Sequence, residues 1–166
     1  HLEVIDDDSE NGILGPFASG GLSIRGKIVS PKRPGSNTEA IQEGYNLELI
    51  TGRPAAPHFH SWTHYSWQSQ EMWPDLYVQI HPTTAENLGV KDGALVSIES
   101  RHGSIHARAW LYSGMRPTSV FIPIGWGERQ PFSKWNSVNF LTDKTQRDPI
   151  SEQTNLKSLL CRVKPI

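Results

Sequence analysis

The feature of this sequence that most constrains its fold is the regular alternation, from Tyr45 onward, of short apolar segments and turn residues. Strand-like patterns occupy residues 47–50, 77–80, 94–100, 105–111, 119–124 and 159–163. Turns such as Asp92-Gly93 separate them about every 8 to 12 residues. A short helix is expected at residues 84–88, ending at Gly89. We therefore predict a mainly β fold, a closed barrel of about six strands with one or two short helices.

Residues 1–44 differ from the rest of the chain, and we interpret them as an arm or connector that precedes a barrel domain at 45–166. They combine an acidic run at 6–10 with a basic turn at 31–35. Short strand-like patches lie at residues 22–24 and 27–29. Such a segment can pack on a neighbouring domain or be a disordered leader, and both alternatives stay open. The start at His1 is expected for a processed product or a piece of a longer protein.

Composition argues against several classes of function. The 16 Lys and Arg residues nearly balance the 17 Asp and Glu residues, so no general field attracts nucleic acid, and no nucleic acid partner is expected. Cys161 is the only cysteine, which excludes an internal disulfide, and its apolar neighbours predict a buried thiol. No apolar run approaches the roughly 18 residues of a membrane span, and the first residues of this sequence lack the pattern of a signal peptide. The compartment stays open.

The polar loop after the first barrel strand is the main candidate site. The strand breaks at Thr51-Gly52-Arg53, where the glycine lets the backbone bend. The guanidinium of Arg53 offers a planar fork of donors suited to a phosphate or a heteroaromatic edge. Further hydrogen-bonding side chains follow within a dozen residues, namely His58, His60, Ser61, Thr63 and His64. A surface loop without a function needs few such groups.

Two other functions compete for this barrel. His58 and His60 would point to the same side of an extended backbone and, with His64, could bind a metal, as in a small β-barrel metalloenzyme. A non-catalytic interaction barrel is the second alternative, because exposed aromatic residues concentrate at protein interfaces. The aromatics in question are Trp62, Trp67, Trp73, Trp126 and Trp135. They equally suit packing against domains outside this chain, which we prefer.

Taken together, residues 45–164 resemble the C-terminal molybdopterin dinucleotide-binding domain of the molybdopterin oxidoreductase (dimethyl sulfoxide reductase) family. The resemblance rests on ordered blocks: Thr51-Gly52-Arg53, His58 to Thr63, Val78 to Pro82, Lys91-Asp92-Gly93, Val96 to Arg101, Gly103-Ser104, Arg116-Pro117, Asn139 to Thr142, Asp148 to Ser151, and Lys157. It implies a six-stranded double-psi β-barrel that covers one side of a bis(molybdopterin guanine dinucleotide) cofactor carrying molybdenum or tungsten.

The resemblance also implies roles for single residues. Thr51, Gly52 and Arg53 would hold the pterin or its pyrophosphate through backbone amides and the guanidinium. The other implied contacts come from His58, His60, Ser61 and Thr63 near the dithiolene, from Asn139 and Thr142, and from the cation of Lys157. Asn139 could instead serve a turn or cap, and Lys157 could be a solvated cation. Trp62 departs from the family pattern, which leaves open whether His58 or His60 faces the pterin.

The function implied by the resemblance is that of a cofactor-binding module in a molybdenum or tungsten oxidoreductase. Such an enzyme performs two-electron or oxygen-atom transfer at a small substrate. Neither a catalytic residue nor a metal ligand is expected in this chain, because in the family the metal's protein ligand comes from another domain. The domain alone is not expected to be active, and its partners would be the remaining domains or subunits of the parent enzyme, which handle the substrate. The substrate and the choice between the two metals stay open.

Overall fold

The structure is a computed structural model in which six strands form a closed barrel. The residues it describes are 2–6, 13–14, 22–26, 41, 43–54, 61–127, 137–143, 145, 147, 153–154, 156–157 and 159–166. Three short strands precede the barrel and pair with one another in the antiparallel order β1-β3-β2. They are β1 (Leu2–Asp6), β2 (Ile13–Leu14) and β3 (Leu22–Gly26).

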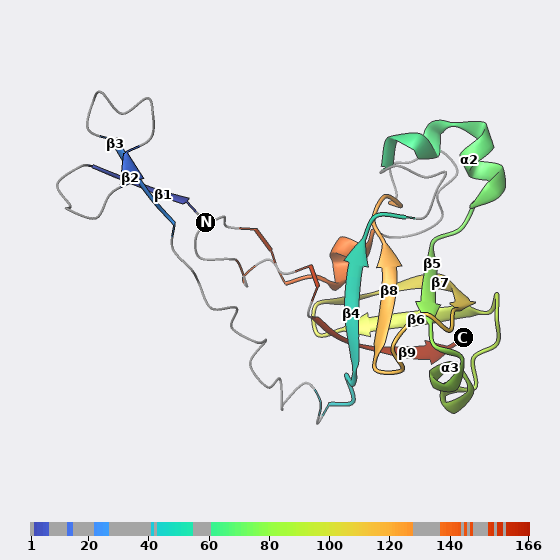
Figure 1. Cartoon of the computed structure of the whole chain (residues 1–166). Helices are drawn as coiled ribbons and strands as arrows, with labels where there is room; N and C mark the ends of the chain where they lie inside the picture. Colours follow the sequence, from blue (N-terminus) through green and yellow to red (C-terminus); the bar gives the residue numbers. More distant parts are fainter. Residues whose placement is uncertain are drawn as a thin grey trace.

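The barrel strands follow in the order β4-β8-β5-β7-β6-β9 around the closed sheet (Figure 1). Their bounds are β4 (Leu47–Gly52), β5 (Tyr77–Ile80), β6 (Leu95–Ser100), β7 (Gly103–Leu111), β8 (Ser119–Pro123) and β9 (Leu159–Pro165). The helical elements are the 3₁₀ helices η1 (Ser61–Tyr65) and η2 (Val138–Leu141) and the α-helices α2 (Trp67–Met72) and α3 (Pro82–Leu88). The predicted mainly β barrel with one or two short α-helices is confirmed.

The strand pairings have an internal two-fold pattern. The pairs β4–β8 and β5–β7 are parallel, and the other four neighbouring pairs are antiparallel. Exchanging β4, β5 and β6 with β7, β8 and β9 leaves every one of these pairings unchanged. The barrel is therefore two interlocked halves of three strands each, as in a double-psi barrel. Because β4 and β8 are parallel neighbours, the segments that follow them leave at the same end of the barrel.

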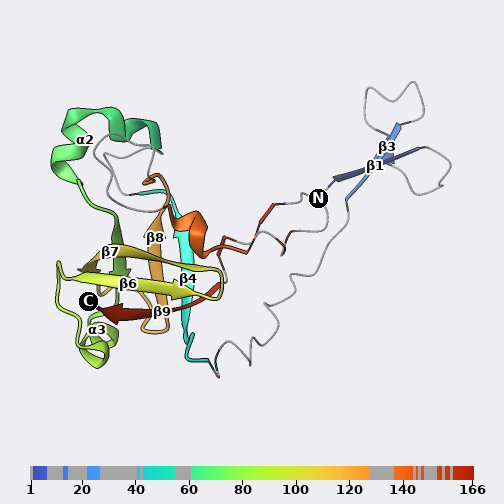
Figure 2. The ribbon, with the colours of Figure 1, turned by 180° about the vertical axis from the view of Figure 1, so that it is seen from behind.

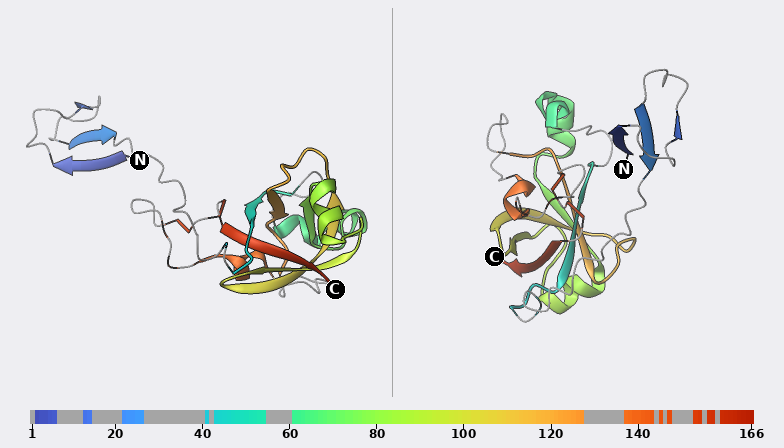
Figure 3. Two further views of the ribbon diagram at one scale, coloured as in Figure 1. Left: turned by 90° about the horizontal axis from the view of Figure 1, so that it is seen from below. Right: turned by 90° about the vertical axis from the view of Figure 1, so that its left-hand side faces the viewer.

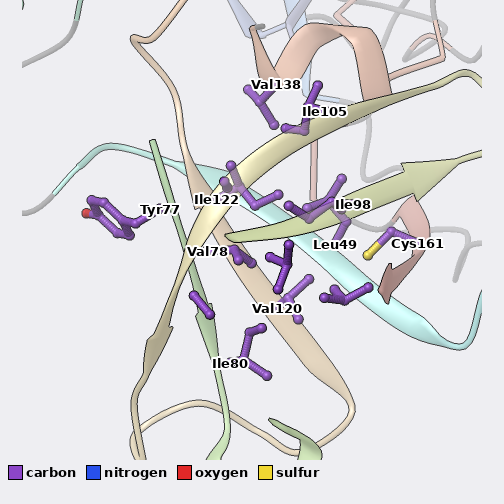
Figure 4. Close-up of a cluster of buried hydrophobic side chains, with 14 of the residues drawn as sticks. Leu49, Tyr77, Val78, Ile80, Ile98, Ile105, Val120, Ile122, Val138 and Cys161 are labelled. Atoms are coloured by element: carbon purple, nitrogen blue, oxygen red, sulfur yellow. The ribbon is translucent and has the colours of Figure 1, made fainter. Parts of the chain in front are cut away.

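The core fills the barrel from the inward face of each strand (Figure 4). The side chains of Leu47, Leu49 and Thr51 are buried along β4, and those between them are half-buried. The same alternation continues in β6 with Val96 and Ile98. It is the period of two expected for strands that have one face in a core. Cys161 on β9 is fully buried among these side chains, which confirms the buried thiol.

The helix α3 begins two residues earlier than the sequence pattern predicted. Its N-cap is His81, whose Nδ1 accepts a hydrogen bond from the Thr83 amide at 3.1 Å. Pro82 occupies the first turn, where its missing amide proton costs nothing. The predicted end is confirmed, since Gly89 adopts a left-handed conformation with φ of 69° and its amide donates to the last turn.

Within the described ranges, no helix combines the length and the apolar character that crossing a membrane would require.

Candidate functional site

Three segments meet where β4 ends. The amide and the hydroxyl of Thr51 both donate to the carbonyl oxygen of Leu156, at 3.1 and 2.7 Å. The carbonyl oxygen of Gly52 accepts a hydrogen bond from the amide of Ile124 at 2.8 Å, just after β8 ends. The end of β4, the segment after β8 and the segment before β9 are thus joined by backbone bonds. These bonds fix the backbone from which the neighbouring side chains extend.

Two cationic side chains follow this junction directly. Arg53 is exposed and comes one residue after Gly52, while Lys157 is exposed and comes one residue after Leu156. The Thr51 to Leu156 bond spans 105 residues of sequence, so the fold joins the backbone segments that carry these two cations. Gly52 itself has little room, because a Cβ atom there would lie 3.0 Å from the Phe121 ring. The chemistry of this donor set suits an anionic, phosphate-bearing ligand.

The predicted polar loop is described in part. His58 and His60 lie outside the described residues. Ser61 and Thr63 belong to η1, where Thr63 is half-buried. His64 is buried, and its ring meets the Trp126 ring edge-on with centroids 4.1 Å apart. Its carbonyl oxygen accepts a hydrogen bond from the Gln70 side chain of α2 at 2.7 Å. His64 thus joins η1 both to α2 and to the segment after β8.

A metal site was one alternative for these histidines. Across the ranges that the structure describes, no group of three His, Cys, Asp or Glu side chains is arranged to hold a metal ion. Of the three histidines in that alternative, only His64 is among these residues, and its ring contacts Trp126.

Aromatic side chains pack the segment between β4 and β5 against the barrel. Trp73, which follows α2, lies 5.0 Å from Tyr77 and 5.1 Å from Trp110, measured between ring centroids. Tyr77 in turn meets the Trp126 ring at 5.8 Å. The interpretation of Trp126 as an exposed interface residue is wrong, since only 4% of it is exposed. Trp67 does face solvent.

The helix η2 carries two further predicted site residues. Asn139 is exposed, and Thr142 is half-buried at the C-terminal end of the helix. The hydroxyl of Thr142 donates to the carbonyl oxygen of Asn139 at 2.8 Å. In the right-hand view of Figure 3, η2 (orange) and α2 (green) both lie toward the end of the barrel to which β4 points. The helix η2 thus brings Asn139 and Thr142 toward this end of the barrel.

The residue that sequence reasoning missed is Leu156. It acts through its backbone carbonyl oxygen, which no side-chain motif can reveal. The signal that was available is Thr51 itself, a hydroxyl on the inward face of a strand, because a buried polar group requires a hydrogen-bond partner.

Comparison with known proteins identifies relatives of this barrel. The family model of the molydopterin dinucleotide binding domain matches residues 47–160. The assimilatory nitrate reductase catalytic subunit of Bacillus subtilis is 32% identical over 139 residues, covering 83% of this chain and 19% of that protein. The dopamine dehydroxylase of Eggerthella lenta is 32% identical over 143 residues, covering 81% of this chain and 14% of that protein.

The fold has a solved counterpart. Acetylene hydratase from Pelobacter acetylenicus superposes with a TM-score of 0.66 at 21% identity, over 77% of this chain and 19% of the other. This chain therefore spans between 14% and 19% of the length of these three proteins.

Proposed function

This chain belongs to the family of molydopterin dinucleotide binding domains, and we propose that it holds the bis(molybdopterin guanine dinucleotide) cofactor of a molybdenum or tungsten oxidoreductase. The observation that carries the proposal is the Thr51 to Leu156 junction, which places Arg53 and Lys157 at one end of the barrel. The relatives named above are far longer than this chain, so other domains are expected beside it.

The residues at the end of β4 fit such a cofactor by their chemistry. A dinucleotide presents a pyrophosphate, and the exposed guanidinium of Arg53 can bind it in a bidentate manner while Lys157 adds a second cation. Gly52 leaves room for the Phe121 ring beside the end of β4 and would contribute through its backbone. Thr51 acts indirectly, because its amide and hydroxyl are both engaged with Leu156.

The pterin would lie against the polar groups of the same half of the barrel. His58, His60, Ser61 and Thr63 supply donors and acceptors from the loop and η1, and Asn139 and Thr142 supply them from η2. Asn139 can both donate and accept, and the Thr142 oxygen keeps the capacity to accept after donating to Asn139. Such a set matches the edges of a pterin, which carry both kinds of group.

The metal chemistry belongs to the cofactor. When bound, the molybdenum or tungsten centre supplies two-electron or oxygen-atom transfer. Cys161 is unsuited to ligate it, because the thiol lies inside the barrel and burial raises its pKa to about 12. We place the metal's protein ligand and the substrate site in the remaining domains or subunits, and we assign residues 1–44 to a connector toward them.

Substitution of Arg53 tests this proposal in the cofactor-loaded protein that contains this chain. Arg53→Ala removes a charge-assisted contact, and we expect the guanine nucleotide released by acid hydrolysis, per polypeptide, to fall about tenfold after dialysis. The melting temperature of the cofactor-free barrel should stay within about 1 °C, because the side chain is exposed.

Arg116→Ala is the matched control. Arg116 is also exposed, but it pairs with Glu48 where β4 and β8 begin, at the end of the barrel away from Arg53. It should keep its full nucleotide content. Equal nucleotide content in the two variants, or an unfolded Arg53→Ala barrel, would count against the proposed site.

A further inference from the structure

We propose that the turn between β6 and β7 is a platform that positions η2 for the cofactor, with Ser100, His102 and Gly103 as positioning residues. The inference rests on the proposed function, since it concerns how Asn139 and Thr142 reach the pterin. It goes beyond that function by assigning a role to residues that would not touch the ligand. Three separate contacts between the turn and the η2 segment carry it.

The first contact is the close approach of η2 to Gly103. A Cβ atom at Gly103 would lie 2.6 Å from the carbonyl oxygen of Phe140 and 3.5 Å from its carbonyl carbon. Both atoms belong to the backbone, so a side chain here could be accommodated only by displacing η2. Gly103 is not among the glycines with positive φ, so its backbone conformation is open to other residues. Space for η2 is therefore the reason for glycine at this position.

The second contact is a buried hydrogen bond. The hydroxyl of Ser100 donates to the carbonyl oxygen of Leu141, the last residue of η2, at 2.9 Å. The Oγ atom of Ser100 in turn accepts a hydrogen bond from the His102 amide at 3.1 Å. Ser100 is buried, so the loss of its hydroxyl would leave the Leu141 carbonyl oxygen without this donor inside the protein. One side chain thus ties the shape of the turn to the position of η2.

The third contact involves Asp143, just beyond η2. Its Oδ2 atom lies 3.9 Å from Nε2 of His102, and its Oδ1 atom accepts hydrogen bonds from the amide and hydroxyl of Thr145 at 2.7 and 2.6 Å. Below the helix, Val138 lies beside Ile105 of β7 (Figure 4). The segment is therefore held to the β6–β7 hairpin from both ends.

A platform matters because η2 is too short to define its own position. It has four residues, and its turns are closed by the bonds from Phe140 to Ser137 and from Thr142 to Asn139. Nucleating a single helical turn is unfavourable in isolation. The placement of the exposed Asn139 side chain consequently depends on the contacts that η2 makes with the β6–β7 turn. Residues of the turn would act on the cofactor through η2.

Gly103→Ala in the cofactor-loaded protein tests the platform. The guanine nucleotide content should fall about tenfold, the loss expected when a polar contact is misplaced. In the cofactor-free protein, hydrogen exchange at the Phe140 and Thr142 amides should become faster. Gly89→Ala is the matched control, because it strains a left-handed glycine but its Cβ would meet nothing within 4 Å. It should lower stability without changing nucleotide content.

A double variant separates positioning from general stability. If Gly103 acts through η2, adding Gly103→Ala to Asn139→Ala should lower nucleotide content by less than Gly103→Ala does in the wild type, because part of its effect runs through Asn139. Ser100→Ala should reproduce the loss, and Ser100→Thr, which keeps the hydroxyl, should restore most of the content. If Gly103→Ala fails to fold, the comparison of Ser100→Ala with Ser100→Thr still tests the platform.

The failure of this inference can be told from the failure of the proposed function. Full nucleotide content in Gly103→Ala, or additive losses in the double variant, would overturn the platform while Arg53→Ala and Asn139→Ala still lost cofactor. Full content in Arg53→Ala and Asn139→Ala as well would overturn the proposed site together with the platform that rests on it.

Discussion

Cys161 shows at the residue scale how burial controls chemistry in this barrel. The thiol lies among apolar side chains on the inward face of β9, and burial raises its pKa to about 12 because the thiolate would lose its hydration. An unfolded chain would release the same proton near pH 8.5. The folded state thus keeps a proton that the unfolded state loses, so the contribution of this group to stability is complete below about pH 8 and declines as the pH rises toward 12.

This difference predicts an alkaline loss of stability that depends on Cys161. Between pH 7.5 and 9.5, wild type should lose about 1 kcal/mol more unfolding free energy than Cys161→Val, which has no proton to release. Urea unfolding of both proteins, with reductant present, at pH 7.5 and at pH 9.5 measures this difference in unfolding free energy. The same loss in both proteins would mean that other groups cause it and that the thiol is not protected.

Single residues also show where prediction from sequence stops. The inward position of Thr51 follows from the alternation along β4, and the exposure of Arg53 follows from the end of that strand. The partner of Thr51 does not follow, because it is the Leu156 carbonyl oxygen, 105 residues away. His64 had the polar character of a ligand, but its contact to Trp126 depends on how two loops fold over each other.

At the scale of elements, the aromatic cluster determines where the crossing segment lies. Trp110 of β7 contacts Trp73 at 5.1 Å and Tyr77 at 5.2 Å, and these rings connect α2 to the barrel wall. Since α2 has only six residues, packing must stabilise it more than its own hydrogen bonds do. The position of η1, which carries Ser61 and Thr63, depends on the same packing.

Trp110→Ala should therefore destabilise the barrel by about 2–3 kcal/mol, because it removes a half-buried ring that makes several aromatic contacts. We also expect limited proteolysis to cut first within residues 61–76. Trp67→Ala, which removes a ring that is 65% exposed, should change stability by less than about 0.5 kcal/mol. Equal effects of the two substitutions would show that the cluster does not hold the segment.

The strands were easier to predict than the helices. The alternating apolar pattern located all the barrel strands. The bounds of β5 agree with the prediction, and the ends of the other strands differ by one or two residues, as in β9, which extends to Pro165. The helices η1, α2 and η2 have no periodic apolar face to reveal them, because four to six residues are less than two turns. Their positions depend on tertiary contacts such as those of Gly103 and Ser100, which a sequence pattern does not contain.

At the scale of the whole molecule, the barrel arranges its site through its topology. Figure 2 shows β6 and β9 running side by side, and their antiparallel register brings the start of β9 toward the β6–β7 turn. The parallel pair β4–β8 directs two crossing segments to the same end. A closed barrel was predictable from the spacing of turns, whereas the convergence of Arg53, Lys157 and η2 was implied only by the family resemblance. The reason is that convergence depends on strand order, which local patterns do not specify.

The most direct test of the account is native mass spectrometry with metal analysis on the protein that contains this chain, purified from its source. We predict a species that carries molybdenum or tungsten together with two molybdopterin guanine dinucleotides. A species without pterin nucleotide that binds stoichiometric zinc or iron would contradict the account and favour a metal site at the histidines.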